Sequence, residues 1–182
     1  MLQITIPDRP KIEAWDEGTN TFVTIPFVKG ATLQLEHSLI SLSKWESKWC
    51  KPFLTAKDKT VEETVDYIKC MTLTQNVRPE VYEILTEENF KQINDYIGSP
   101  MTATTFREDK KQKRNREIIT AELIYYWMIA LNIPFECQKW HLNKLLTLVR
   151  VCNVKNEPPK KMSKNELYKH HAAVNAARRK RH

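Results

Sequence analysis

Apolar and polar residues alternate along residues 1–36, where β-branched side chains are frequent. Three segments carry this pattern: Leu2–Pro7, Thr21–Val28 and Thr32–Leu35. An alternation with a period of two predicts strands, and the turn-forming pair Lys29-Gly30 separates the last two segments. We therefore expect a small N-terminal β-hairpin or three-stranded sheet that is not stable by itself.

From about His37 the apolar positions recur with a helical period. Leu39, Leu42, Trp45 and Trp49 lie on one face of a predicted helix, which Pro52 ends.

Capping residues predict three further helices in the middle of the chain. Thr60 and Glu63 form a capping box, which opens a helix whose expected inward face is Val61, Val65, Ile68 and Met71. Pro79 suits the first position of a short helix, and Thr86 caps a helix with Phe90, Ile93 and Ile97 facing inward.

After the polar segment 106–116 comes the most apolar part of the chain. We expect one helical stripe there, formed by Ile118, Ile119, Leu123, Ile124, Trp127, Met128 and Leu131. Asn132-Ile133-Pro134 ends it, and a second helix is predicted over Phe135–Val151, with an inward face of Leu142, Leu145, Leu146 and Val149 that Trp140 would extend. The two helices predict an antiparallel helical hairpin at the centre of the core.

The fold class that follows is mainly α. We expect a small β appendage over residues 1–36, a helical bundle over residues 37–157, and a basic C-terminal helical arm over residues 158–182. Pro158 and Pro159 open this segment, and Ser163 with Glu166 forms a second capping box at the start of its predicted helix.

The net positive charge of the chain lies in this arm. Residues 160–182 contain one acid, Glu166, and eight basic residues: Lys160, Lys161, Lys164, Lys169, Arg178, Arg179, Lys180 and Arg181. Their net charge of +7 equals that of the whole chain, so the preceding residues balance. Such an arm binds nucleic acid, a membrane or an acidic protein surface. Its apolar stripe is too thin to favour a membrane.

Composition excludes several classes of protein. Three glycines cannot form the Gly-rich loops of nucleotide-binding folds. The N-terminus carries no secretory signal, no apolar run is long enough to cross a bilayer, and four widely spaced cysteines indicate free thiols in a reducing cytoplasm.

Candidate enzymatic and metal chemistry is weak. Cys137 and His141 share a face if both lie on one helix, but the close ligand pairs of structural zinc sites are missing. His170-His171, Asn175 and His182 have the residue types of a His-Asn-His nuclease, yet all fall in one predicted helix. We therefore expect no enzyme activity, no cofactor and no metal.

Binding chemistry is the remaining interpretation. Trp45 and Trp49 lie one turn apart, and if either is exposed it would anchor an interface. The predicted partner-binding residues are these two tryptophans and the eight basic residues of the arm.

Four segments of the chain have distinctive sequences: Leu35–Phe53 (LEHSLISLSKWESKWCKPF), Ile119–Asn153, Pro158–Ser163 (PPKKMS) and Ala172–Lys180 (AAVNAARRK). They resemble a family of small proteins encoded in the tail modules of long-tailed bacteriophages, the tail assembly chaperones. The resemblance implies a non-enzymatic protein in the host cell cytoplasm that binds the tape measure protein and assists assembly of the tail tube protein. Self-association is a further expectation.

Two alternatives stay open. The arm is also compatible with a nucleic-acid-binding phage protein, which is the less favoured reading, since the arm carries one aromatic residue, Tyr168. A structural component of the virion, at the head–tail junction or in the tube, is the other.

Overall fold

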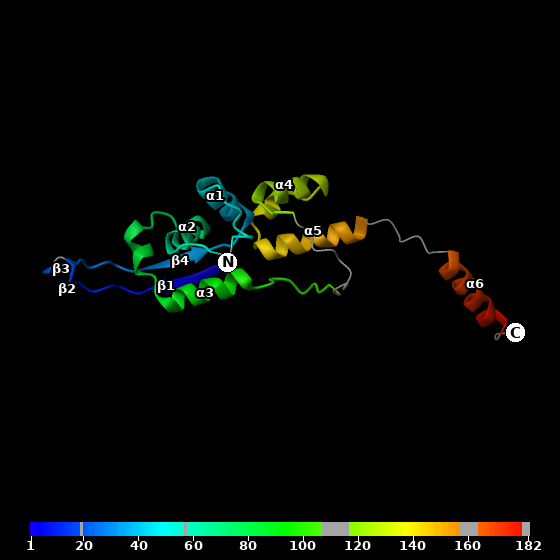
Figure 1. The fold of residues 1–182 in the computed structure, drawn as a ribbon, viewed down its shortest axis with the longest axis horizontal. Coiled ribbons are helices and arrows are strands. Elements are labelled where there is room, and N and C mark those ends of the chain that lie inside the picture. The colour runs from blue at the N-terminus through cyan, green and yellow to red at the C-terminus, as the bar shows by residue number, and fades with distance from the viewer. Residues whose placement is uncertain (19, 57, 107–116, 157–163, 180–182) are drawn as a thin grey trace. The chain divides into compact units, whose positions relative to one another are not determined.

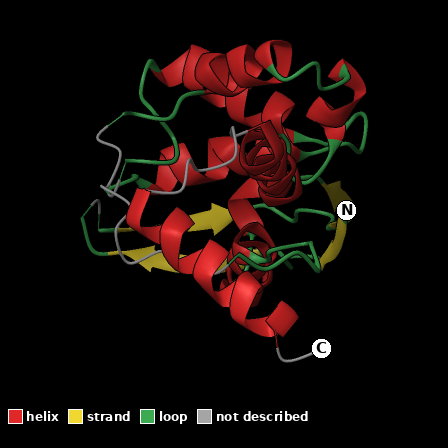
Figure 2. Cartoon of the chain, turned by 90° about the vertical axis from the view of Figure 1, so that its right-hand side faces the viewer, coloured by secondary structure: helices red, strands yellow, loops and turns green. Residues whose placement is uncertain are grey.

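The computed structural model describes residues 1–18, 20–56, 58–106, 117–156 and 164–179 (Figure 1). Its fold is mainly α, with about 52% of the chain in helices (Figure 2). The chain divides into two compact units, Met1–Val151 and Cys152–His182. The predicted division at residues 36 and 157 is finer than this one and stays a prediction.

The N-terminal residues form one long antiparallel hairpin with two ladders. The base ladder pairs β1 (Leu2–Ile6) with β4 (Ala31–Leu35), and the ribbon pairs β2 (Ile12–Asp16) with β3 (Thr21–Ile25). The predicted hairpin is therefore present, whereas the three-stranded alternative is wrong and the strand Ile12–Asp16 was not predicted.

Prolines explain why the hairpin is split in two. Pro7, Pro10 and Pro26 lie between the ladders and have no amide hydrogen to donate. One isolated bridge connects the ladders, in which the Arg9 and Val28 backbones exchange hydrogen bonds of 2.9 and 3.0 Å.

The base ladder belongs to the core of the first unit. Its inward residues are almost completely buried: Ile4, Ile6, Leu33 and Leu35. Helix α3 (Glu87–Gly98) packs on β1. The outer edge of β4 is covered by the backbone that follows α2 (Val61–Met71), because the Leu73 amide donates to the Gln34 carbonyl at 2.8 Å.

Helix α1 (Leu39–Trp49) is the centre of the helical part. It packs against α2 and α4 (Ala121–Ala130), and it also contacts the 3₁₀ helix η2 (Phe135–Lys139). The predicted stripe of α1 is confirmed for Leu39, Leu42 and Trp45, which are fully buried. The expectation that a helical hairpin after residue 117 forms the centre of the core is wrong.

The predicted helix starts at Thr60 and Thr86 are confirmed, and both residues cap their helices through side-chain hydrogen bonds. The short helix after Pro79 is present as the 3₁₀ helix η1 (Pro79–Ile84).

The predicted inward face of α2 is correct for Ile68 and Met71 and wrong for Val61, which is 77% exposed. Glu63 points inward instead, since it pairs with Lys51 and caps Thr60. Two residues apart on a helix face nearly opposite directions, so the inward Glu63 turns Val61 outward.

The predicted continuous helix over Phe135–Val151 is also wrong. The chain breaks between η2 and α5 (Leu142–Asn156), because the Leu142 amide donates to the His37 carbonyl at 2.7 Å. Trp140 lies at this break and is partly exposed rather than turned inward. The stripe expected from Ile118 starts later, since Thr120 caps α4 and Ile118 is exposed.

The second unit contains α6 (Lys164–Arg179). Its predicted capping residue, Ser163, lies outside the described residues. None of the helices in the described part of the chain combines the length and apolarity that crossing a membrane requires.

Candidate partner-binding surfaces

Both tryptophans predicted as interface anchors hold α1 against α2 instead. Trp45 is fully buried, and its indole N–H donates to the Glu63 carbonyl at 2.8 Å. Trp49 is half-buried and donates to the Asp66 carboxylate at 3.0 Å. Trp45 therefore lacks the exposure on which its predicted role as an interface anchor depended. Trp49 is only partly accessible.

The basic residues of the arm are only partly covered by the structure. Lys169 and Arg179 lie on α6 and are exposed. Lys164 and Arg178 belong to the same helix, but their side chains are outside the described ones. Lys160, Lys161, Lys180 and Arg181 lie outside the described residues.

An apolar groove runs between α2 and the segment that joins η1 to α3. We call it the α2–α3 groove, and its volume is about 450 Å³. Val61 and Val65 form one wall, one helical turn apart, and Leu85 and Phe90 contribute to the other. Since Val61 is 77% exposed, the groove is open to a partner.

Charged residues of both signs surround this groove. Glu62 and Glu83 supply carboxylates, and Lys69 supplies a cation whose Nζ lies 5.5 Å from the centre of the Tyr82 ring. A groove with an apolar floor and a mixed charged rim is the geometry that receives an amphipathic helix.

The remaining rim charges are held in an ion pair. Lys48 Nζ lies 2.5 Å from Asp66 Oδ1. Burial alone would raise the pKa of Asp66, but the hydrogen bonds from Lys48 and Trp49 outweigh it and lower the pKa. Asp66 therefore stays ionised and fixes one end of the groove.

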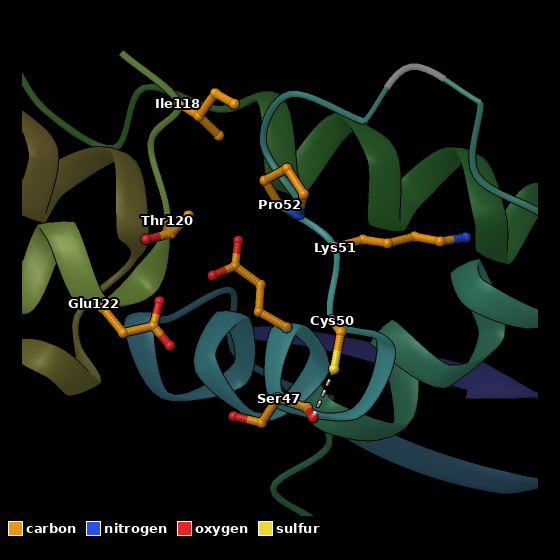
Figure 3. A pocket seen from close by; sticks show the side chains of 8 residues that line it. Ser47, Cys50, Lys51, Pro52, Ile118, Thr120 and Glu122 are labelled. Carbon is orange, nitrogen blue, oxygen red and sulfur yellow. Dashed lines mark hydrogen bonds between the residues drawn. The ribbon is translucent and has the colours of Figure 1, made fainter.

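A second pocket, of about 430 Å³, lies between the end of α1 and the start of α4 (Figure 3). Its central carboxylate is that of Glu46, which is buried and uses both oxygens. One accepts from the Phe53 amide at 2.8 Å and the other from the Ala121 amide at 2.7 Å.

Glu46 therefore has a structural role that the sequence did not reveal. It joins the loop after α1 to the first turn of α4, where a negative charge also favours the helix dipole. Figure 3 shows the Lys51 side chain directed away from the pocket, in agreement with its ion pair to Glu63. The Cys50 thiol is exposed at the pocket rim.

Two buried histidines meet where β4, α2, α3 and α5 converge. The rings of His37 and His141 lie 5.1 Å apart between their centres. His37 Nδ1 is 2.6 Å from the Tyr67 hydroxyl, and His141 Nε2 is 3.0 Å from the Tyr96 carbonyl. Because the Asn143 amide donates to His141 Nδ1, Nε2 carries the proton of the neutral ring.

Burial controls the charge of this pair. The pKa of His37 is lowered to about 4, mainly by desolvation and to a smaller extent by the nearby His141. Desolvation also lowers the pKa of His141. Both rings are therefore neutral at neutral pH, as packed core groups are. No local pattern predicts that the two histidines meet, since they are 104 positions apart in the chain.

The structure separates the two residues of the candidate metal half-site, and it describes only part of the His-Asn-His set. Cys137 is buried in η2 and His141 lies beyond the helix break, so the two do not share a helical face. Among the described residues, no three His, Cys, Asp or Glu side chains gather closely enough to hold a metal ion. His182 lies outside the described residues.

The ribbon exposes apolar side chains on both faces. Trp15 and Phe22 pair across the strands on one face, with ring centres 4.8 Å apart. Ala14 and Val23 pair on the other, and Ile12 lies beside them. Figure 1 shows β2 and β3 beyond the helices of the first unit. This surface was not predicted, because the segment from Ile12 to Trp15 was not recognised as a strand.

No family model matches the chain, and no curated protein or solved structure matches it either.

Proposed function

We propose that the protein is a non-enzymatic phage tail assembly chaperone that binds helical segments of the tape measure protein in the α2–α3 groove. The observation that carries the proposal is the groove itself, with exposed Val61 beside Val65 and carboxylates and lysines around them. A long helical client needs its apolar face covered until assembly, and such a groove covers it.

The remaining sequence-based expectations form part of the same proposal. The helices of the first unit act as a bundle that presents the groove, and the basic helix α6 adds positive charge that attracts acidic segments of a client. The tail tube protein then replaces the chaperone on the tape measure protein, in the host cytoplasm.

Co-expression with the tape measure protein of the same tail module tests this proposal. Val61→Glu places a charge in the groove without opening the core, since Val61 is exposed. The substitution also suits the helix, because acidic residues are favourable at the first position of α2. We expect most of the client to become insoluble. Tyr126→Glu, at an exposed position of α4, is the matched control and should keep the client soluble. The proposal is overturned if the client is equally soluble with the native chain, with Val61→Glu and with Tyr126→Glu.

Nucleic-acid binding is the second candidate, and the exposure of Lys169 and Arg179 on α6 favours it. It predicts duplex binding whose affinity falls steeply with salt, and Lys169→Glu should reduce the slope of log K against log salt by about 1. If duplex DNA does not bind at about 0.1 M salt, this candidate fails. A lasting structural role would instead place the protein in purified virions.

A further inference from the structure

We propose that the ribbon binds the ribbon of a second copy of this chain, through the outer edge of β3, to form a four-stranded antiparallel sheet. This inference does not depend on the client groove. It concerns a different surface of the first unit.

The first argument is the stability of the ribbon itself. A two-stranded hairpin is marginal in water, and three or more strands with an apolar face are needed for independent stability. Trp15 is 50% exposed and Phe22 is 73% exposed, so one face is apolar and uncovered. Val23 is 44% exposed on the other face. Adding strands covers part of both faces at once.

The second argument is the contrast along one leg of the hairpin. β3 and β4 belong to the same leg, and the outer edge of β4 is covered by the backbone at Met71–Leu73. Among backbone hydrogen bonds between described residues, none joins Phe22–Ile25 to a segment outside the ribbon. The covered edge therefore continues into an open one.

The third argument is the distribution of charge. Soluble proteins protect open strand edges with charged residues or proline. β2 carries Glu13 and Asp16, with Lys11 before it and Glu17 after it. Thr21–Ile25 contains no charged residue and no proline. The unprotected edge is therefore that of β3, and strand addition is expected there.

The sequence of β3 suits pairing with itself. Antiparallel pairing about a two-fold axis at Val23 places Val23 opposite the same residue of the second copy and Phe22 opposite Thr24 of that copy. The charged β2 strands then lie on the outer edges, about 14 Å apart at the usual strand spacing. This distance exceeds the screening length of about 8 Å at physiological salt, so their acids do not oppose dimer formation.

Charge substitutions at one cross-strand pair test the register. Val23→Lys places two lysines opposite each other in the dimer, whereas Ala14→Lys, at its partner position on β2, places the charge on an outer strand. Sedimentation equilibrium of the full chain should show a dimer. Val23→Lys should weaken it by at least about tenfold and Ala14→Lys by less than about threefold.

A mixture of Val23→Lys and Val23→Glu supplies the decisive comparison. Only the two-fold register brings these side chains together, so the mixture should recover the affinity of the native chain to within about threefold. The proposal is overturned if the native chain stays monomeric at about 100 µM. It is also overturned if the mixture stays as weak as Val23→Lys alone. A thermal denaturation of each variant confirms that the monomer remains folded.

Discussion

The two ladders of the N-terminal hairpin have the same length and the same antiparallel pairing, yet they have opposite environments. In the base ladder, Ile4 and Leu33 are buried beneath α3 and the helical core. In the ribbon, Trp15 and Phe22 face solvent. Strand pairing alone therefore does not determine whether a hairpin is buried or exposed. The base ladder is part of the core because helices cover it, whereas no helix among the described residues buries Trp15 or Phe22 of the ribbon.

The largest expected effect comes from truncating one buried and one exposed side chain on the same leg. Leu33→Ala should lower the free energy of unfolding by about 2–5 kcal/mol, because it leaves a cavity in the core. Val23→Ala should lower it by less than about 1 kcal/mol, since that side chain is half exposed. Urea denaturation followed by tryptophan fluorescence measures both. Equal losses would contradict the division of the hairpin.

Acid should destabilise the first unit through the buried histidine at the end of the base ladder. His37 follows β4, and its pKa of about 4 in the folded chain lies below the ordinary value of 6.5. The unfolded chain therefore binds more protons, so stability is full above pH 6.5 and falls as the pH drops towards 4.

Between pH 7 and 5 the free energy of unfolding should fall by about 2 kcal/mol, from 1.36 kcal/mol per unit of pKa shift. Carboxylates such as Asp66, whose pKa is lowered, contribute below this range. His37→Gln should flatten the dependence even if it destabilises the fold. If the dependence of the free energy of unfolding on pH is unchanged in His37→Gln, His37 is not its cause.

A methyl group added at Gly30, at the junction of the two ladders, should destabilise the hairpin. A Cβ at Gly30 would overlap the Ile6 carbonyl oxygen and approach Pro7, and the Gly30 amide donates to Asp8 at 2.7 Å. Gly30→Ala should therefore lower the free energy of unfolding by about 1–3 kcal/mol. Gly98→Ala is the matched control, because a Cβ there meets nothing within 4 Å. It should be neutral or slightly stabilising in a thermal melt. A neutral Gly30→Ala would show that the junction is looser than described.

The smallest effect is expected from the aromatic pair of the ribbon. Trp15→Ala should change the stability of the monomer by less than about 1 kcal/mol, since the Trp15–Phe22 contact is exposed. The same substitution should reduce dimer affinity, because it removes apolar surface from the extended sheet. Sedimentation and thermal melts on one sample separate the two effects. A large loss of monomer stability would mean that the ribbon supports the core.

Local sequence signals predicted the parts of the fold that local chemistry determines. The caps at Thr60 and Thr86 and the stripe of α1 depend on residues within one or two turns, and they were predicted correctly except for Trp49, which is only half-buried. The break before α5 depends on the bond from Leu142 to His37, which no local pattern contains.

The surfaces were harder to predict than the elements. Val61 faces outward because Glu63 faces inward, where it forms an ion pair with Lys51. That ion pair is a tertiary contact, which the local pattern of α2 does not contain. The burial of Trp45 likewise depends on α2. The exposed ribbon could have been suspected from the alternation beginning at Ile12, but its lack of a covering helix could not.

Hydrogen–deuterium exchange at two protein concentrations tests the central claim most directly. At about 1 µM the amides of Phe22–Thr24 should exchange quickly, and those of β4 should stay protected. At about 100 µM the β3 amides should become at least tenfold more protected, while β4 stays unchanged. If β3 is as protected as β4 at the lower concentration, or remains unprotected when the chain is dimeric, the ribbon is not the surface that the account describes.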